Sequence, residues 1–274
     1  MNLFTPAEIA KNYIAIGKAK VNTPIGRMFL LAVLAGAFIG LGGVGATTAA
    51  VSIPYASVGK LVGACIFPGG LTMVLLAGSE LFTGNTLLVI PLLEKEIRLA
   101  EMLKSWGIVY IGNLVGGFLV AAGIVYSHQI SLFNNQMAVS VISTAASKCT
   151  LTFGDALIRG IFCNFLVCIA VWISFAAKDV AGKIAGLFFP IMIFVLCGFE
   201  HSVANMYYIS AGLFANGIPA YSQAALEAGL DTNALTWGNF FIKNLLPVTI
   251  GNIIGGAVCV GCAYWFLYLR KKEK

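Results

Sequence analysis

The sequence predicts an all-α integral membrane protein with six transmembrane helices that form two inverted halves. Of the 274 residues, 59% are hydrophobic and only 10% are charged, and the mean hydropathy is +0.91. Soluble domains carry roughly a quarter charged residues, so this composition excludes an ordinary soluble protein. The long apolar blocks suit helices of about 20 residues, the length that crosses a bilayer core. Two motifs that each occur twice divide the chain into its halves.

Residues 1–27 are expected to form an amphipathic helix on the cytoplasmic face of the membrane. Thr5 suits the N-cap, Pro6 suits the first helical position, and Glu8 completes a capping box. The apolar residues that then share one face are Ile9, Tyr13 and Ile16. A solvated tail is the alternative, because interfacial helices and tails have similar charge content. No apolar core of signal-peptide length precedes residue 28, so no cleavable signal peptide is expected.

The chain is expected to be a single transmembrane domain, 1–274, with a first half at 28–127 and a second half at 150–270. The six expected spans are 28–50, 61–93, 105–126, 160–177, 184–213 and 245–269. The first span is uncharged and glycine-rich, and small residues let helix backbones approach closely in lipid. The second and fifth spans are each interrupted by a short polar stretch, so they are expected to be broken helices.

The two polar stretches follow one pattern, Gly-x-Glu-x-x-x-x-Asn. The first runs from Gly78 to Asn85, and the second runs from Gly198 to Asn205. Carboxylate, imidazole and carboxamide groups are costly at membrane depth, so these side chains are expected to face a cavity or a pathway. Four of them are expected to be structural and to accept hydrogen bonds from the broken backbone or to support it: Glu80, Glu200, Asn85 and Asn205.

A second motif, Ile-Gly-Asn-x-x-Gly-Gly, occurs at 111–117 in the third span and at 250–256 in the sixth. Each half has an odd number of spans, so the second half must cross the membrane in the opposite sense to the first. Broken helices at corresponding positions of such an inverted repeat indicate a site near the bilayer midplane. Chance similarity between glycine-rich helices is the alternative, but two motifs recur in the same order.

The distribution of basic residues predicts which side of the membrane each end faces. Most of the 17 Lys and Arg residues fall on the side that holds both termini, and the positive-inside rule makes that side cytoplasmic. They are Lys11, Lys18, Lys20, Arg27, Lys95, Arg98, Lys104, Lys178, Lys183, Arg270, Lys271, Lys272 and Lys274. The outer face is expected to hold Lys60, Lys148, Arg159 and Lys243. The net charge of +6 therefore reflects orientation and anionic lipid, and no nucleic-acid partner is expected.

Three stretches resemble signatures of the formate/nitrite transporter family, which covers formate, nitrite and hydrosulfide channels. They are Gly-Phe-Glu-His-Ser-Val-Ala-Asn at 198–205, Glu-Leu-Phe-Thr at 80–83, and Pro-Val-Thr-Ile-Gly-Asn-Ile-Ile-Gly-Gly at 247–256. The resemblance implies an aquaporin-like protomer of six helices, a homopentamer, and one anion pore in each protomer. A bacterial hydrosulfide channel of the cytoplasmic (inner) membrane is the favoured relative. Hydrosulfide is therefore the expected permeant, with formate and nitrite as related ones, and a dedicated formate or nitrite channel is the alternative.

The same resemblance implies a role for ten residues along the pore. His201 is implied as the central histidine, Thr83 as its hydrogen-bonding neighbour, and Lys148 as the residue that draws anions to the outer vestibule. The implied apolar constrictions are Phe67, Leu71 and Phe194 on the outer side, and Leu81 and Phe82 on the inner side. The implied polar positions are Asn164 and Asn252. Without the resemblance, the aromatic residues would be read as core packing and Lys148 as a solvated loop lysine.

Such parts suit the passage of a small weak-acid anion. A bare anion that enters an apolar ring loses its hydration at a cost of several kcal/mol, whereas the protonated acid crosses more easily. A basic residue at the mouth concentrates the anion, and an imidazole that titrates near neutral pH supplies or withholds a proton. The breaks are also expected to expose backbone N–H groups, which favour negative charge.

Other functions fit the sequence less well. An enzyme is not expected, because the chain lacks the H-E-x-x-H, Walker and G-x-S-x-G motifs. The seven cysteines are scattered through apolar helices, so no metal or cofactor is expected. A neutral-solute channel of aquaporin type remains an alternative, although paired Asn-Pro-Ala boxes are missing. A structural scaffold would leave the polar breaks unexplained.

Overall fold

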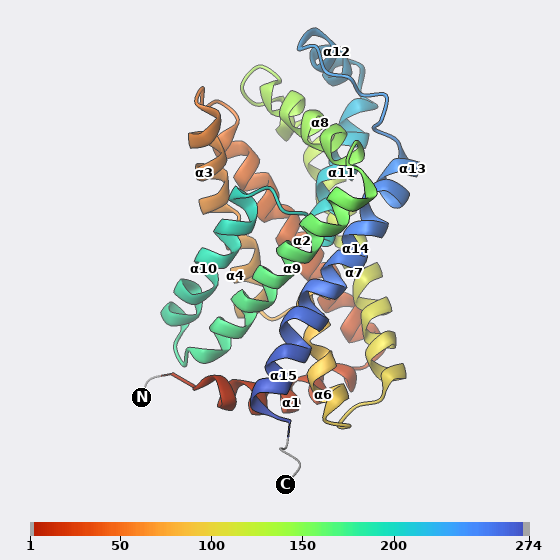
Figure 1. The fold of residues 1–274 in the computed structure, drawn as a ribbon. Helices are drawn as coiled ribbons and strands as arrows, with labels where there is room; N and C mark the ends of the chain where they lie inside the picture. The colour runs from red at the N-terminus through yellow and green to blue at the C-terminus, as the bar shows by residue number, and fades with distance from the viewer. Residues whose placement is uncertain (1–2, 271–274) are drawn as a thin grey trace.

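The computed structural model describes residues 3–270, which form an upright bundle of helices with both described chain ends at its lower end (Figure 1). The described residues contain no strand, only an isolated bridge between Leu3 and Ala177. The tail lysines Lys271, Lys272 and Lys274 lie outside the described residues. We call the end of the bundle near the chain termini the inner end and the opposite end the outer end.

The first helix lies across the inner end of the bundle, as Figure 1 shows. α1 spans Pro6–Val21, and the predicted capping box is present: the Thr5 N–H donates to the Glu8 carboxylate at 2.7 Å, and the Glu8 N–H donates to Thr5 Oγ1 at 3.4 Å. Ile9 and Tyr13 are buried against the bundle. α1 therefore has one apolar face, which covers the inner end of the bundle, and its predicted place on the cytoplasmic face of the membrane stays a prediction.

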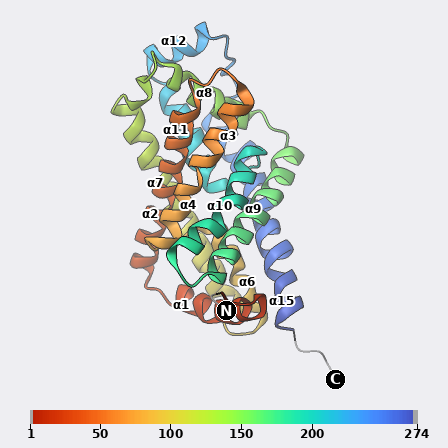
Figure 2. The same ribbon diagram turned by 90° about the vertical axis from the view of Figure 1, so that its left-hand side faces the viewer.

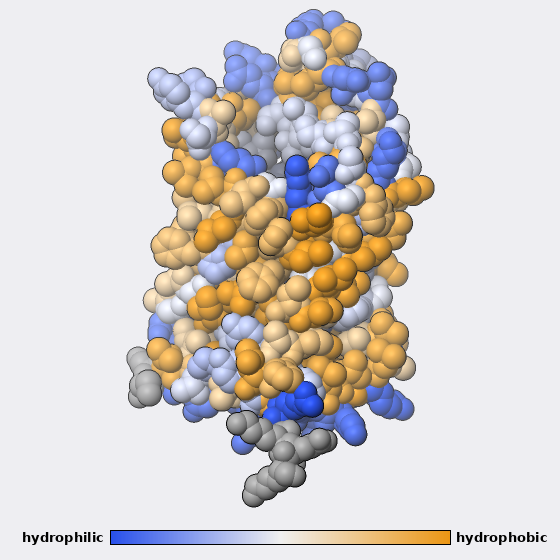
Figure 3. Space-filling model, in the orientation of Figure 1, coloured by the Kyte–Doolittle hydropathy of each residue, from blue (hydrophilic) through white to orange (hydrophobic). Residues whose placement is uncertain are grey.

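Five helical stretches are long and apolar enough to cross a membrane. They are Ile25–Ala50 (α2), Ala56–Leu76 (α3 and α4), Leu99–Tyr126 (α7), Phe153–Ala176 (α9) and Trp237–Tyr268. On the face that Figure 3 shows, apolar residues cover the middle of the molecule and polar residues gather toward its two ends. The protein is thus an all-α, multi-pass membrane protein, as predicted.

The spans begin earlier than the hydropathy pattern predicts. α7 begins at Leu99 instead of residue 105, and α9 begins at Phe153 instead of residue 160. The reason is that a helix continues into the polar interface wherever its backbone bonds and caps are satisfied. At α9, for example, the Thr152 hydroxyl accepts a hydrogen bond from the Asp155 N–H at 3.1 Å.

The second and fifth predicted spans are both broken, as the sequence predicts. The second consists of α3 (Ala56–Ile66), α4 (Pro68–Leu76), α5 (Phe82–Asn85), the 3₁₀ turn η1 (Thr86–Leu88) and α6 (Val89–Leu93). The fifth consists of α10 (Val180–Leu196) and α11 (Ser202–Asn216). Each upstream half ends just before a glycine with positive φ, Gly78 at 80° and Gly198 at 70°. Glycine adopts this conformation at little cost, which lets the chain turn out of the helix.

The two broken spans run in opposite directions through the bundle. In Figure 1 the chain passes from α3 at the outer end to α6 at the inner end, whereas α10 rises from the inner end toward α11. The non-helical residues 77–81 and 197–201 lie between the halves of each span. This arrangement is the inverted repeat that the duplicated motifs predict.

Several further elements, which the hydropathy pattern does not predict, cover the outer end (Figure 2). They are η2 (Gln129–Ser131), α8 (Gln136–Cys149) and α12 (Pro219–Glu227).

The last span is one long stretch made of α13 (Trp237–Asn239), η3 (Phe240–Leu245), α14 (Leu246–Ile253), η4 (Ile254–Cys262) and α15 (Ala263–Tyr268). η3 and η4 are π-helical, a form that is rare and is associated with functional regions.

Glycines bring the spans of each half into backbone contact. A side chain at these glycines would collide with the main chain of the neighbouring helix, and the pairs of Gly116 and Gly255 are equivalent in the two halves. The facing pairs are Gly36 with Asn113, Gly116 with Val33, Gly251 with Leu157 and Gly255 with Ile161. In lipid, where helices gain little from burying apolar surface, such close approach contributes much of the association energy.

Candidate functional site

A buried carboxylate marks the inner break. The Glu80 carboxylate accepts hydrogen bonds from the Asn85 amide at 2.8 Å and from the ammonium group of Lys20 at 2.8 Å. Lys20 comes from α1 and is only partly exposed in this pair. In the sequence, Lys20 is recognisable only as a positive charge at the inner face, because nothing local to α1 indicates its partner.

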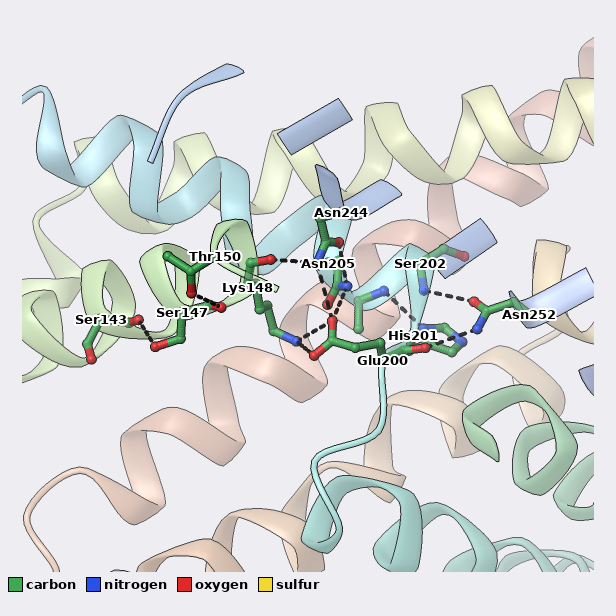
Figure 4. Close-up of polar contacts among 11 residues, drawn as sticks. Ser143, Ser147, Lys148, Thr150, Glu200, His201, Ser202, Asn205, Asn244 and Asn252 are labelled. Atoms are coloured by element: carbon green, nitrogen blue, oxygen red, sulfur yellow. Dashed lines mark hydrogen bonds and ion pairs between the residues drawn. The ribbon is translucent and has the colours of Figure 1, made fainter. Parts of the chain in front are cut away.

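The outer break carries the equivalent cluster, drawn in Figure 4. The Glu200 carboxylate accepts from Lys148 Nζ at 2.9 and 3.0 Å and from the Asn205 amide at 2.6 Å. Asn244 adds a longer hydrogen bond of 3.4 Å to the same carboxylate. The prediction that the two glutamates bind backbone N–H groups is therefore wrong: both bind side-chain donors, because a lysine compensates a buried charge better than a neutral amide.

Two asparagines bind the backbone at the breaks instead. Asn113 Oδ1 accepts the N–H of Phe82 at 2.9 Å, and its amide donates to the carbonyl of Glu80 at 2.9 Å. Asn252 does the same at the other break, accepting the N–H of Ser202 at 2.9 Å and donating to the carbonyl of Glu200 at 3.0 Å. The first N–H of each downstream half-helix is therefore occupied, contrary to the expectation that the breaks expose these groups.

Asn113 was missed as a site residue, although the sequence contained the signal. It occupies the Asn position of the first Ile-Gly-Asn string, and Asn252 occupies the same position of the second. Both amides also donate to a neighbouring span, Asn113 to the Ala32 carbonyl at 2.7 Å and Asn252 to the Gly160 carbonyl at 2.8 Å. The duplicated motif thus encodes duplicated supports for the broken backbone.

The two breaks meet at His201 and Thr83. The hydroxyl of Thr83 lies 2.9 Å from Nε2 of His201, and both residues are buried. Nδ1 of His201 accepts the N–H of Ala204 at 3.0 Å, which makes the imidazole the N-cap of α11. Since a ring nitrogen that accepts an N–H bond carries no proton, the neutral ring has its proton on Nε2. That N–H is directed to the oxygen of Thr83.

Asn164, on α9, links the backbone after the inner break to Asn252, which supports the outer break. Its amide donates to the Asn252 carbonyl at 2.7 Å, to Thr86 Oγ1 at 3.1 Å and to the Thr83 carbonyl at 3.2 Å. Asn164 and Asn252 were both predicted as polar site residues, and the structure brings them together. They hold the backbone around the central pair and make no direct hydrogen bond to His201.

Two cavities lie on either side of the central pair. The outer cavity has a volume of about 560 Å³ and is lined by Phe67, Phe194 and His201, among others. The inner cavity has a volume of about 30 Å³ and is lined by Leu71 and Leu81, together with residues of α1. This volume is enough for about one or two water molecules, so the inner cavity is far smaller than the outer one.

The predicted constriction residues divide between these cavities differently from the expectation. Phe67 and Phe194 meet edge to face with ring centroids 5.6 Å apart, and Phe194 stacks on His201 at 5.9 Å. Leu71, expected in the outer constriction, lines the inner cavity, because one helical turn carries it about 6 Å inward from Phe67. Phe82 lines neither cavity and packs against Trp106 and Tyr110.

Lys148 does not stand free in the outer cavity. It lies in the last turn of α8, its ammonium group is bound to Glu200, and it lies 5.7 Å from the centre of the Tyr208 ring. Its side chain is only 16% exposed. Lys148 and its partner therefore form a mostly buried, neutralised pair, whereas the family resemblance implies a lysine that attracts anions into the vestibule.

Mirrored half-helices that meet at a buried polar pair between two cavities define a membrane transport protein. The sequence model described as Formate/nitrite transporter matches residues 7–266, and the chain belongs to this family. The resemblance noted in the sequence is thereby confirmed. So is the expectation that the protein is not an enzyme, because the family consists of channels and transporters.

Curated relatives and solved structures agree with this assignment. The chain is 39% identical to "Probable formate transporter" of Methanothermobacter thermautotrophicus, covering 97% of this chain and 98% of that protein. It is 37% identical to "Formate channel FocA" of Escherichia coli (strain K12), covering 99% of this chain and 97% of that protein. A solved structure titled "Pentameric formate channel with formate bound" matches with a TM-score of 0.78 and 34% identity, covering 90% of this chain and 98% of that one.

Proposed function

We propose that the protein is a channel for small monovalent weak-acid anions and that formate is its principal permeant. The observation that carries this proposal is the hydrogen bond between His201 and Thr83, which stands where two mirrored helix breaks meet between two cavities. The printed names of the relatives favour formate. Hydrosulfide, the permeant predicted from the sequence, and nitrite stay predictions as alternative permeants.

Desolvation explains why a weak acid suits this passage. Phe67 and Phe194 border the outer cavity next to His201, so an anion that moves inward must exchange water for aromatic surface. Full loss of hydration costs an anion several kcal/mol, and its protonated form far less. We propose that a proton from the aqueous side first converts the His201 ring to an imidazolium, which gives its Nε2 proton to the anion and returns to the neutral ring, while the Thr83 hydroxyl donates a hydrogen bond to the anion.

The assembly and the orientation complete the proposal. We infer a homopentamer with one pore in each protomer, since a similar solved structure is titled a pentameric channel. We further infer that it lies in a bacterial inner membrane, as the family resemblance implies, and that both termini face the cytoplasm, as the positive-inside rule predicts. Native mass spectrometry of the purified protein measures the number of protomers, and accessibility of a cysteine added at each end measures the orientation.

Flux through purified protein in liposomes tests the permeant. Formate, nitrite, hydrosulfide, acetate, lactate and glycerol are offered separately at pH 5.5 and pH 7.5, and empty liposomes give the background. A formate channel carries formate fastest, does so faster at the lower pH, and excludes glycerol. Faster hydrosulfide flux would make hydrosulfide the principal permeant. Glycerol flux without anion flux would instead indicate a neutral-solute channel.

A further inference from the structure

Three basic residues line the outer cavity: Lys60, Lys148 and Arg159. Lys148 is paired with Glu200. Within residues 3–270, neither Lys60 nor Arg159 forms an ion pair or a side-chain hydrogen bond, and both side chains are exposed to the cavity or solvent. The cavity therefore contains two uncompensated positive charges, and they belong to residues other than the lysine to which the sequence analysis gave this role.

We propose that Lys60 and Arg159 form an anion-capture site in the outer cavity, which holds one small monovalent anion before it reaches His201. This inference rests on the proposed function and names two residues that determine how the permeant enters. Capture at this site raises the local anion concentration at the outer side of the aromatic constriction.

The positions of the two residues suit this role. Arg159 lies in the first turns of α9, and its carbonyl accepts the N–H of Glu200 at 3.3 Å, which holds its backbone beside the outer break. Lys60 lies on α3 seven positions before Phe67, so the two share a helix face, with Lys60 about 10 Å further out. One cation is therefore placed near the constriction, and the other is placed on the path that leads to it.

The rest of the cavity suits a hydrated anion held weakly. Hydroxyl groups from α8 and α2 line it, and they can donate hydrogen bonds to an anion or its water: Thr47, Ser140, Ser143 and Thr144. At about 560 Å³ the cavity has room for an anion with much of its water shell. The charges therefore act without full desolvation, which favours fast exchange over tight binding.

The inner cavity has no comparable pair of charges. Of the residues that line it, Lys20 is the one basic residue, and its ammonium group is bound to Glu80 at 2.8 Å. The mirrored design thus supplies a neutralised lysine at both breaks, Lys20 and Lys148, and the two unpaired cations are added at the outer side. Capture is expected for anions that arrive from the outer side.

Formate uptake into membrane vesicles of both orientations tests the proposal. The half-saturating concentration is measured for the full chain and for the double variant Lys60→Gln/Arg159→Gln. From the outer side this concentration is expected to rise about tenfold, with the maximal rate changed less than about twofold. From the inner side it is expected to stay unchanged. The charge-keeping variant Lys60→Arg/Arg159→Lys is expected to retain the original value.

Lys243→Gln is the matched control, because Lys243 is an exposed basic residue of the same end of the bundle that does not line the cavity. An unchanged half-saturation in the double variant overturns the proposal. So does an equal shift in the Lys243→Gln control, or a shift of the same size from both sides. If the double variant does not assemble, the proposal is tested on the unaltered protein. The half-saturating formate concentration measured from the outer side must then rise more steeply with ionic strength than the one measured from the inner side.

The proposed function and the capture site fail in different ways. Unaltered protein that carries no formate but carries nitrite or hydrosulfide corrects the permeant, and the same comparison is then made with that anion. Unaltered protein that carries none of these anions refutes the proposed function. Unaltered protein that carries formate, together with a double variant of identical half-saturation, refutes the capture site alone.

Discussion

Thr83 and His201 stand 118 positions apart in the sequence, and the two mirrored breaks bring the threonine hydroxyl within 2.9 Å of the imidazole Nε2. The same imidazole caps α11 through its other nitrogen, Nδ1. Nδ1 of His201 therefore has a structural role at the helix cap, and Nε2 has the proposed functional role at the central pair. The two roles can be separated by substitution.

His201→Asn is expected to fold but to lose the pH dependence of formate flux. Asparagine is as good an N-cap as any residue, so its side chain replaces Nδ1 as acceptor for the Ala204 N–H. It cannot place a proton at the position of Nε2. Loss of one hydrogen bond of about 1 kcal/mol predicts a roughly fivefold lower flux at pH 7. Liposome flux between pH 5 and 8 checks this.

His201→Phe provides the comparison, because it removes the cap and the proton together. It is expected to lower both the thermal stability and the flux. If His201→Asn keeps the original pH profile and selectivity, the imidazole has no part in proton exchange. The structural role of the cap would remain in that case.

Lys148→Met is expected to destabilise the protein more than the double variant Lys148→Met/Glu200→Gln. The single change leaves the Glu200 charge buried and without its partner, which costs about 3 to 5 kcal/mol. The double variant removes both charges. Thermal unfolding of the detergent-solubilised proteins shows which of the two variants is the less stable.

The exposed pair of Lys18 and Glu96 is the control for this comparison. Its side chains are 49% and 44% exposed, so Lys18→Met is expected to change the stability little. A single Lys148→Met variant as stable as the double variant would show that burial of the Glu200 charge carries no such cost.

Gly116→Ala is expected to weaken the packing of α7 against α2. A methyl group at this position would meet the carbonyl of Val33, which belongs to the main chain and cannot move aside alone. Overpacking of this kind costs about 1 to 3 kcal/mol. Gly123→Ala, in the same helix, has open space around the added methyl group and is expected to be neutral or slightly stabilising. Equal melting temperatures of the two variants would contradict the prediction.

The start of α1 is expected to loosen in acid. The hydrogen bond from the Thr5 backbone N–H lowers the pKa of the Glu8 carboxyl below its usual value of 4.5. A lowered pKa in the folded state means that the stabilisation is complete above pH 4.5 and is lost as the pH falls through the lowered value. A spin label at Lys11 is expected to gain mobility over this range. In Glu8→Gln, the mobility is expected to be independent of pH.

The sequence predicts the parts of this fold that depend on local or repeated patterns. Thr5 and Glu8 define the start of α1 because a capping box is a four-residue pattern. The breaks at Gly78 and Gly198 are predictable because glycine and glutamate interrupt an apolar run twice in one arrangement. The inverted repeat follows from those motifs and from an odd number of spans in each half.

The contacts between distant segments could not be predicted in the same way. Glu200 binds Lys148, which lies 52 positions earlier, and no pattern in the loop distinguishes this lysine from one in solvent. The outer helices α8 and α12 are short and carry polar residues, so a search for long apolar blocks passes over them. Unpaired cations are equally invisible in sequence, since Arg159 is identified only by the absence of a partner in the described structure.

The asparagine supports have a kinetic consequence. Asn252 takes the N–H of Ser202, and His201 takes the N–H of Ala204, so the start of α11 has few donors left for an ion in transit. A helix start with free N–H groups would retain an anion. A permeating anion therefore meets a shallow free-energy well at the midpoint of the pore. Its residence there is brief, and fast passage is favoured over retention.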